Sequence, residues 1–185
     1  MGFGFSKIQI NLGYNKVTLF IIDEQSKRRL KFNGITHILS IYELAKPTHK
    51  EYKYKCIRIP DHEHQDISQF FKECIEFIHE CRIHNGSVLV HCVCGVSRSV
   101  TVVAAYLMAI SNISWRQSLN AVKASRTQAN PNSGFRRQLM KFEERQLAEL
   151  RKELKEKYPE YNPSYDDGYL EELLRKMSSS SPILM

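Results

Sequence analysis

The first forty residues lack an apolar run that could span a bilayer or form the core of a secretory signal. The longest such run, residues 17–22, is far shorter than the roughly 20 residues that a membrane-spanning helix needs. The five cysteines are odd in number and include no C-x2-C pair, which argues against a disulfide framework. We therefore expect a protein of a reducing compartment, the cytoplasm.

Acidic residues are also scarce outside the C-terminal end. Lys and Arg number 27 against 20 Asp and Glu, a net charge of +7, and 42% of the 185 residues are apolar. From Tyr158 onward five acids face two bases, net −3, so residues 1–157 carry +10. A basic body suits phosphorylated substrates or an anionic membrane surface, although a solvated basic face explains any single patch equally well.

The most informative stretch is residues 88–99, which read VLVHCVCGVSRS. The β-branched run 88–90 predicts a buried strand, and the mostly apolar run 100–110 predicts a helix. Five residues separate Cys92 from Arg98, and Gly95 allows the backbone to turn sharply. The loop can therefore curl until its N–H groups converge at the positive end of a helix, which makes an anion site.

The side chains of this loop point to chemistry at phosphorus. Arg98 offers a planar pair of donors that matches two phosphate oxygens. The same positive surroundings favour Cys92 as a thiolate that attacks phosphorus, and Ser99 can donate its hydroxyl to the sulfur when it leaves. His91 is expected to orient the loop rather than to act as the base. The loop residues expected to surround the phosphate are Val93, Cys94, Gly95, Val96, Ser97 and Arg98.

This chemistry also needs an acid to protonate the leaving oxygen. The loop that follows the strand expected at residues 54–59 offers five candidates, namely Asp61, His62, Glu63, His64 and Asp66. Spacing alone does not choose among them, and Asp66 has a competing role as a helix cap.

The alternation of strands and helices predicts a single compact α/β domain, with a central, mostly parallel sheet flanked by helices on both faces. Strands are expected at residues 35–40, 54–59 and 88–90. A helix is expected to start at Asp66, to bury Cys74 and Cys81 on one apolar stripe, and to end at Gly86.

Later segments predict further helices and an extension. Ser114 and Gln117 form a capping-box pattern, and the break at residues 130–132 precedes another helix. Past Glu143 this helix becomes strongly charged, so we expect it to project into solvent, and we expect little order from Pro159 onward. The expected division is a catalytic domain at residues 1–145 and a charged helical extension with a disordered tail at residues 146–185.

Several segments carry a family resemblance: THILS, the aspartate loop, FKECIEFIHECR, HCVCGVSRSVT and ANPNSGFRRQL. Together with the HC-x5-R-[ST] pattern, they resemble the small atypical dual-specificity phosphatases of the cysteine-dependent phosphatase superfamily, and in particular the N-myristoylated subgroup that includes the JNK stimulatory phosphatase. The resemblance implies a phosphotyrosine-phosphatase-like fold. It also implies that Asp61 is the general acid, Cys92 the nucleophile, Arg98 the phosphate-binding residue and Ser99 the assisting serine.

The N-terminus matches the M-G-x-x-x-[ST] pattern for N-myristoylation, with Gly2 as the acceptor and Ser6 in the required place. One acyl chain holds a protein to a membrane only weakly, so a second signal is needed. The basic cluster of Lys27, Arg28, Arg29 and Lys31 is a candidate for that signal.

We interpret the sequence as a protein phosphatase that hydrolyses phosphotyrosine and phosphoserine or phosphothreonine through a phosphocysteine. The expected partners are phosphorylated proteins of kinase signalling pathways and the inner face of the plasma membrane, with no metal, cofactor or nucleic acid.

A phosphopeptide-binding module that no longer turns over is the alternative from another class. A phosphoinositide or RNA-end phosphatase is a lesser one, because the loop carries no lysine to hold further phosphates. A thiol oxidoreductase lacks the C-x-x-C spacing.

Overall fold

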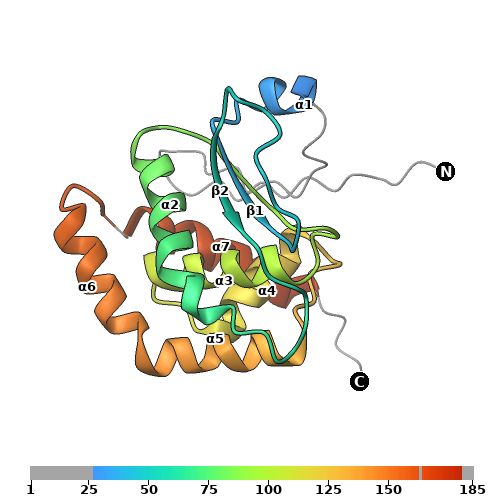
Figure 1. Cartoon of the computed structure of the whole chain (residues 1–185). Coiled ribbons are helices and arrows are strands. Elements are labelled where there is room, and N and C mark those ends of the chain that lie inside the picture. Colours follow the sequence, from blue (N-terminus) through green and yellow to red (C-terminus); the bar gives the residue numbers. More distant parts are fainter. Residues whose placement is uncertain (1–26, 163, 181–185) are drawn as a thin grey trace.

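The computed structural model describes residues 27–162 and 164–180. Its elements follow one another as α1 (Lys27–Phe32), β1 (His37–Ile41), β2 (Lys53–Ile57), η1 (Ser68–Phe70), α2 (Phe71–Ile83), β3 (Val88–His91), α3 (Arg98–Ile110), α4 (Trp115–Ser125), α5 (Ser133–Arg145), α6 (Leu147–Lys157) and α7 (Ser164–Ser180) (Figure 1). None of the described helices is long and apolar enough to cross a membrane.

The three strands form one parallel sheet in the order β2-β1-β3. His37 at the start of β1 is paired with Lys53 of β2 and with Val88 of β3, so all three strands end at the same edge of the sheet. The loops that follow β2 and β3 therefore leave from that edge, where open parallel sheets bind ligands. The predicted α/β class with a parallel sheet is confirmed.

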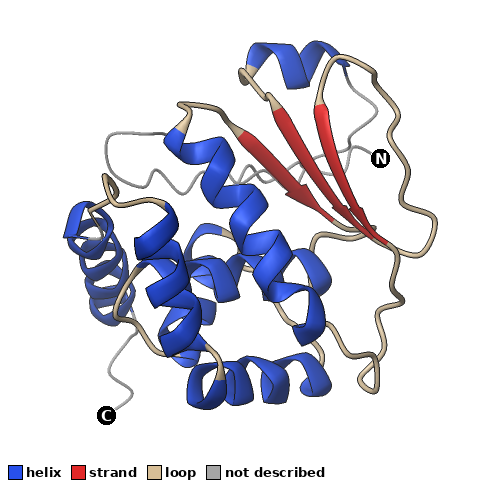
Figure 2. Cartoon of the chain, turned by 60° about the vertical axis from the view of Figure 1, so that its left-hand side comes forward, coloured by secondary structure: helices blue, strands red, loops and turns tan. Residues whose placement is uncertain are grey.

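The helices are divided unevenly between the two faces of the sheet (Figure 2). One face packs Leu39 and Val90 into the main core with α2 and with α3, whose thirteen residues are all buried. The other face packs Ile38 and Leu89 against Leu30 of α1. A fully buried helix behind the sheet gives the loop between β3 and α3 a rigid support.

Helix α2 begins later than the sequence suggests, which corrects the expected start at Asp66. The Asp66 carboxylate accepts bonds from Ser68 Oγ at 2.7 Å and Gln69 N at 3.3 Å, but the turn that it caps is η1, and regular α-helix starts only at Phe71. The helix also ends before the expected Gly86, at Ile83. Asn85 takes the left-handed conformation, with a φ of 57°, and Gly86 N donates to the Cys81 carbonyl. Between these ends Cys74 and Cys81 are buried, as predicted, and burial raises the pKa of both thiols.

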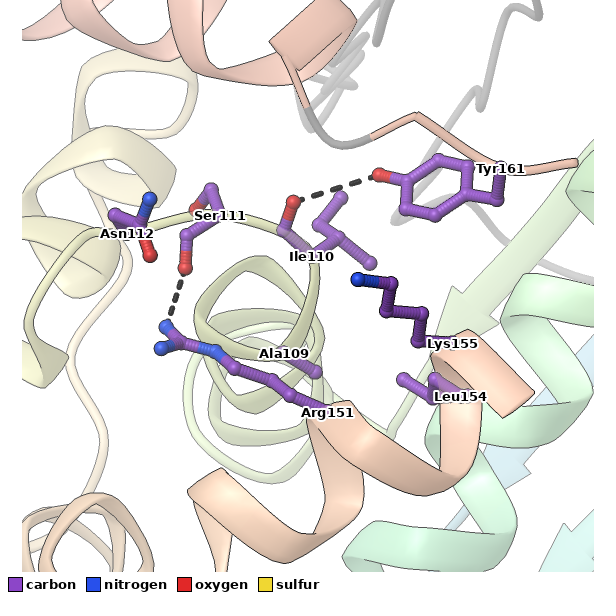
Figure 3. A pocket seen from close by; sticks show the side chains of 8 residues that line it. All are labelled: Ala109, Ile110, Ser111, Asn112, Arg151, Leu154, Lys155 and Tyr161. Atoms are coloured by element: carbon purple, nitrogen blue, oxygen red, sulfur yellow. Dashed lines mark hydrogen bonds between the residues drawn. The ribbon is translucent and has the colours of Figure 1, made fainter. Parts of the chain in front are cut away.

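The prediction that the last helix continues past Glu143 into solvent is wrong. α5 ends at Arg145, and α6 packs back on the body through the buried Leu147, Leu150 and Leu154. Arg151 of α6 donates from Nη2 to the Met108 carbonyl at 2.8 Å and to the Ser111 carbonyl, which caps the C-terminal end of α3 (Figure 3). Three leucines at helical spacing form an apolar stripe that the surrounding charges concealed in the sequence.

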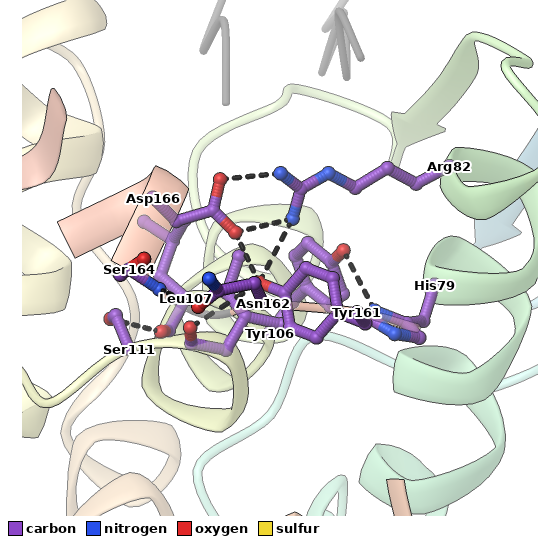
Figure 4. Close-up of polar contacts among 10 residues, drawn as sticks. His79, Arg82, Tyr106, Leu107, Ser111, Tyr161, Asn162, Ser164 and Asp166 are labelled. Carbon is purple, nitrogen blue, oxygen red and sulfur yellow. Dashed lines mark hydrogen bonds and ion pairs between the residues drawn. The ribbon is translucent and has the colours of Figure 1, made fainter. Parts of the chain in front are cut away.

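The expectation of little order from Pro159 is also wrong over residues 164–180, which form α7. A buried ion pair fixes this helix to α2, with Arg82 Nη1 donating to Asp166 Oδ2 at 2.6 Å (Figure 4). The Tyr161 hydroxyl donates to the same carboxylate, and the ring of Tyr161 lies edge-on to buried His79, with ring centroids 4.6 Å apart. Burial, with a smaller contribution from the Arg82 charge, lowers the pKa of His79 to about 4. Removing one partner of a buried ion pair typically costs about 3–5 kcal/mol, so this contact anchors a segment of low overall hydrophobicity.

Candidate active site

The loop that links β3 to α3 occupies residues 92–97 and ends at the N-terminus of a thirteen-residue helix. Gly95 has a φ of +62°, a left-handed conformation that favours glycine. Cys92 is only 6% exposed at the start of the loop. The aligned peptide dipoles of α3 place partial positive charge at the end of this loop, and this charge favours a bound anion.

Ser99 lies in the first turn of α3, with its Oγ 3.2 Å from the Cys92 Sγ. Both residues are buried. A hydroxyl at this distance can donate a hydrogen bond to a thiolate, so it can stabilise the negative charge that the sulfur carries before attack and after departure.

Arg98 is held in one orientation by the backbone that follows β2. Its Nη1 donates to the Ile59 carbonyl at 2.9 Å. Its Nε is buried and has no hydrogen-bond partner among the described residues. The bond through Nη1 leaves the edge formed by Nε and Nη2 available as a two-pronged donor, the geometry that suits two phosphate oxygens.

Asp61 reaches this site from the loop that follows β2. Its Oδ1 accepts bonds from Ser97 Oγ at 2.8 Å and from Asn132 Nδ2 at 2.9 Å, and its Oδ2 lies 3.6 Å from Arg98 Nε. Among the five acid candidates in the loop after β2, Asp61 is the one bonded to the loop of residues 92–97. Asp66 is bonded to η1, as described above, and Glu63 accepts a bond from Ser133 Oγ at 2.6 Å that lowers the pKa of Glu63.

His91 is the last residue of β3. Its Nε2 and the Ser40 Oγ of β1 are 2.7 Å apart, and its ring contacts Tyr42, with centroids 5.8 Å apart. His91 thus ties the start of the loop to the neighbouring strand.

Arg126, which the sequence did not single out, braces the outer side of the loop. It donates from Nε to the Gly95 carbonyl at 2.8 Å and from Nη2 to the Cys94 carbonyl at 3.2 Å. The Asn130 N–H donates to the Val96 carbonyl at 2.9 Å. With their carbonyls bonded from outside, these peptide units can present their N–H groups toward the centre of the loop.

Val93 and Cys94 are exposed, and Val93 retains 70% of its accessible surface.

The N-terminus of α5 holds the loop that carries Asp61. Besides bonding Asp61, Asn132 caps α5 by accepting from Phe135 N at 2.9 Å. Gln138 accepts bonds from the backbone N–H groups of Ile67 and Ser68 at 2.8 and 3.0 Å. A Cβ on Gly134 would lie 1.8 Å from the Glu63 carbonyl oxygen, so the close approach requires glycine. In the sequence this segment was visible as a chain break, a helix start and part of the family resemblance, but its contacts were not, because partners about seventy residues apart leave no local pattern.

The sequence profile described as "Dual specificity phosphatase, catalytic domain" matches residues 19–145. The chain belongs to the dual-specificity phosphatase family. Human dual specificity protein phosphatase 22 is 44% identical over 160 residues, which cover 86% of this chain and 85% of that protein. Mouse dual specificity protein phosphatase 15 is 41% identical over 174 residues, covering 94% of this chain and 72% of that protein. The crystal structure of DUSP15 superposes with a TM-score of 0.74 at 40% identity, over 80% of this chain and 95% of that one.

Membership in this family confirms the predicted activity. The chain is a cysteine-dependent dual-specificity protein phosphatase with the phosphotyrosine-phosphatase-like α/β fold. The lipidation candidate Gly2 lies outside the described residues.

Proposed function

We propose that Cys92 is the nucleophile of this phosphatase and that the loop of residues 93–98 binds the substrate phosphate. The backbone N–H groups of the loop and the Nε–Nη2 edge of Arg98 bind the non-bridging oxygens, and Arg98 exchanges its contact with Asp61 for these oxygens. The Cys92 thiolate then attacks phosphorus in line with the leaving oxygen. The separation of 3.2 Å between Cys92 Sγ and Ser99 Oγ allows Ser99 to donate a hydrogen bond to the sulfur in this step.

Asp61 acts as the general acid in this step. The S–P bond forms as the P–O bond breaks, and the leaving oxygen takes the proton of the Asp61 carboxyl. The observation that carries this assignment is the position of Asp61, which is bonded to Ser97 of the loop and lies 3.6 Å from Arg98.

The phosphocysteine is then hydrolysed by water. The Asp61 carboxylate takes a proton from the water as its oxygen bonds to phosphorus, and the S–P bond breaks to return the thiolate. Ser99 donates a hydrogen bond to the departing sulfur. Inorganic phosphate is released, and Asp61 is again protonated for the next cycle.

Matched variants of the two aspartates test this assignment. Asp61→Asn should lower kcat on a phosphotyrosine peptide by about 10²- to 10⁴-fold, and it should lower kcat less on an aryl phosphate with a good leaving group. Asp66→Asn should keep nearly full activity, because Asp66 caps η1. An inactive but folded Asp66→Asn together with an active Asp61→Asn would move the acid to Asp66.

The substrates are phosphorylated proteins of kinase signalling pathways. The exposed Val93 and Cys94 place uncharged side chains at the mouth of the loop, which suits a peptide better than an inositol with several phosphates. Metal-free assays should show turnover of phosphotyrosine and phosphothreonine peptides that exceeds turnover of phosphoinositides. The opposite order would contradict this substrate class.

Membrane attachment uses Gly2 as the acylation site, at the inner face of the plasma membrane. Helix α1 supports this role, because Arg28 and Lys31 are exposed and Phe32 beside them retains 87% of its accessible surface, a basic and apolar combination that favours anionic interfaces. In cells, mass spectrometry should find myristate on Gly2, and Gly2→Ala should move the protein to the soluble fraction. An unmodified Gly2 with the same distribution for both proteins would refute the attachment.

A further inference from the structure

A cavity of about 230 Å³ lies at the end of α3 that is remote from the catalytic loop (Figure 3). Its walls come from the end of α3, from α6 and from the segment before α7. The lining residues are Ala109, Ile110, Ser111, Asn112, Arg151, Leu154, Lys155 and Tyr161. Because α3 runs from Arg98 to Ile110 with a rise of 1.5 Å per residue, the cavity lies about 18 Å from the phosphate site.

Most polar groups around the cavity are already bonded within the protein. Arg151 donates to the carbonyls of Met108 and Ser111, as described above. The Ser111 hydroxyl donates to the Leu107 carbonyl at 2.6 Å. The Tyr161 hydroxyl is bonded to Asp166 (Figure 4) and lies 3.4 Å from the Ile110 carbonyl.

Lys155 is the exception. Its ammonium has no hydrogen bond or ion pair among the described residues, and Figure 3 shows it reaching from α6 toward the end of α3. None of the described lining residues is a carboxylate. Asp167 and Glu143 act on Arg151, since they oppose the lowering of its pKa by burial. Lys155 is exposed at the edge of the cavity, where its charge is not paired with a described acid.

The remaining walls are apolar, formed by the side chains of Ala109, Ile110 and Leu154 and the ring of Tyr161. A cavity of about 150 Å³ in another protein accommodates benzene, so the volume here suits a phenyl ring with a short chain. We propose that this cavity binds a small monocarboxylate, with its apolar body between α3 and α6 and its carboxylate on Lys155. A single ammonium balances one negative charge, whereas a phosphate dianion favours several donors.

The site is independent of the catalytic chemistry. Its residues are not those of the phosphate loop, and its wall at Tyr161 is fixed by the same carboxylate that anchors α7 to Arg82. A ligand that binds only the folded protein stabilises it by mass action, so the bound carboxylate should also raise the melting temperature.

Titration of the full chain with 3-phenylpropionate, followed by amide chemical shifts, tests the proposal, and 3-phenylpropan-1-ol serves as the uncharged analogue. The acid should perturb signals of residues 109–112 and 151–155 and of Tyr161, with a Kd of about 1 mM. Lys155→Met should weaken the acid about five- to tenfold and the alcohol less than about twofold. Lys152→Met, which changes an exposed lysine of the same helix outside the lining, should leave both affinities unchanged.

Ala109→Leu fills the cavity and should abolish binding of both compounds while the chain stays folded. Lys155 is exposed, so its substitution tests the charge without risk to the core. Three results would overturn the proposal: perturbations confined to residues 92–98, an acid and an alcohol that bind Lys155→Met and wild type alike, or no perturbation up to about 20 mM acid.

Discussion

At the scale of single residues, the Arg98 guanidinium is oriented by the protein itself. The Ile59 carbonyl binds Nη1, so the orientation of the guanidinium is fixed before substrate binds, and only the 3.6 Å contact of Nε with Asp61 is exchanged for phosphate oxygens. Such fixed donors stabilise the transition state because they need no reorganisation as charge develops.

Arg98→Lys should therefore lower kcat/KM by about 10³-fold or more although the charge is kept, since the ammonium replaces two coplanar donors with one point charge. Arg116→Lys is the matched control, because Arg116 is exposed and its guanidinium lies over the Trp115 ring, 4.4 Å from its centroid. Steady-state rates on a phosphotyrosine peptide measure both. Near-normal activity of Arg98→Lys would show that bidentate binding is unnecessary.

At the scale of elements, α5 positions the acid loop against the phosphate loop. Asn132 bonds Asp61, Gln138 bonds the backbone at Ile67 and Ser68, and Gly134 lets the Glu63 backbone approach. The proposed acid and the proposed nucleophile come from the loops after β2 and β3, and Asn132 at this helix N-terminus is bonded to both loops.

Gly134→Ala should displace the acid loop, because its Cβ would lie 1.8 Å from the Glu63 carbonyl oxygen. A misplacement of about 1 Å can cost about 10²-fold in rate, so kcat on phosphopeptides should fall by 10- to 100-fold, and less on activated aryl phosphates. Gly168→Ala in α7, where a Cβ meets nothing within 4 Å, should keep full activity and stabilise the fold by up to about 1 kcal/mol. Equal kcat values for Gly134→Ala and Gly168→Ala would refute the positioning role of α5.

The elements also show which parts of the site could be predicted. Cys92, Arg98 and Ser99 lie within eight residues of one another and follow a strand signal, so their pattern is visible locally. Asp61 could be selected only through the family resemblance, because a loop with five titratable residues offers no internal criterion. Arg126 and Asn132 act across the fold, on residues more than thirty positions away, so no local pattern in the sequence assigned these contacts to them.

At the scale of the whole molecule, the C-terminal third is part of the globular body. The sequence suggested a charged, projecting extension, because three leucines of α6 lie among charges and the anchor of α7 is an ion pair. Hydrophobic patterning does not reveal a buried pair of Arg82 and Asp166, since each residue alone predicts exposure.

The same buried cluster makes the stability of the fold depend on pH. The pKa of His79 is lowered from 6.5 to about 4 by burial and then by the Arg82 charge. Between these values the unfolded chain binds a proton that the folded protein does not, so the free energy of unfolding falls as the pH falls from about 6.5 to 4, by on the order of 3 kcal/mol.

Denaturant unfolding at several pH values should show this decrease in wild type and a smaller decrease in His79→Gln. Substitution of the exposed His84 by Gln provides the control and should retain the wild-type slope. Identical slopes for wild type and His79→Gln would show that His79 does not set the acid sensitivity.

The central claim is that phosphate passes through Cys92, and rapid quenching with p-nitrophenyl phosphate tests it most directly. Ser99→Ala lacks the hydroxyl 3.2 Å from Cys92 Sγ, so return of the thiolate should become the slow step. We expect a burst of one equivalent of nitrophenolate per Ser99→Ala enzyme, and acid-quenched protein should carry a phosphoryl group on the peptide that contains Cys92. Release without a burst, no phosphoryl group on Cys92, and continued turnover by Cys92→Ser would contradict it.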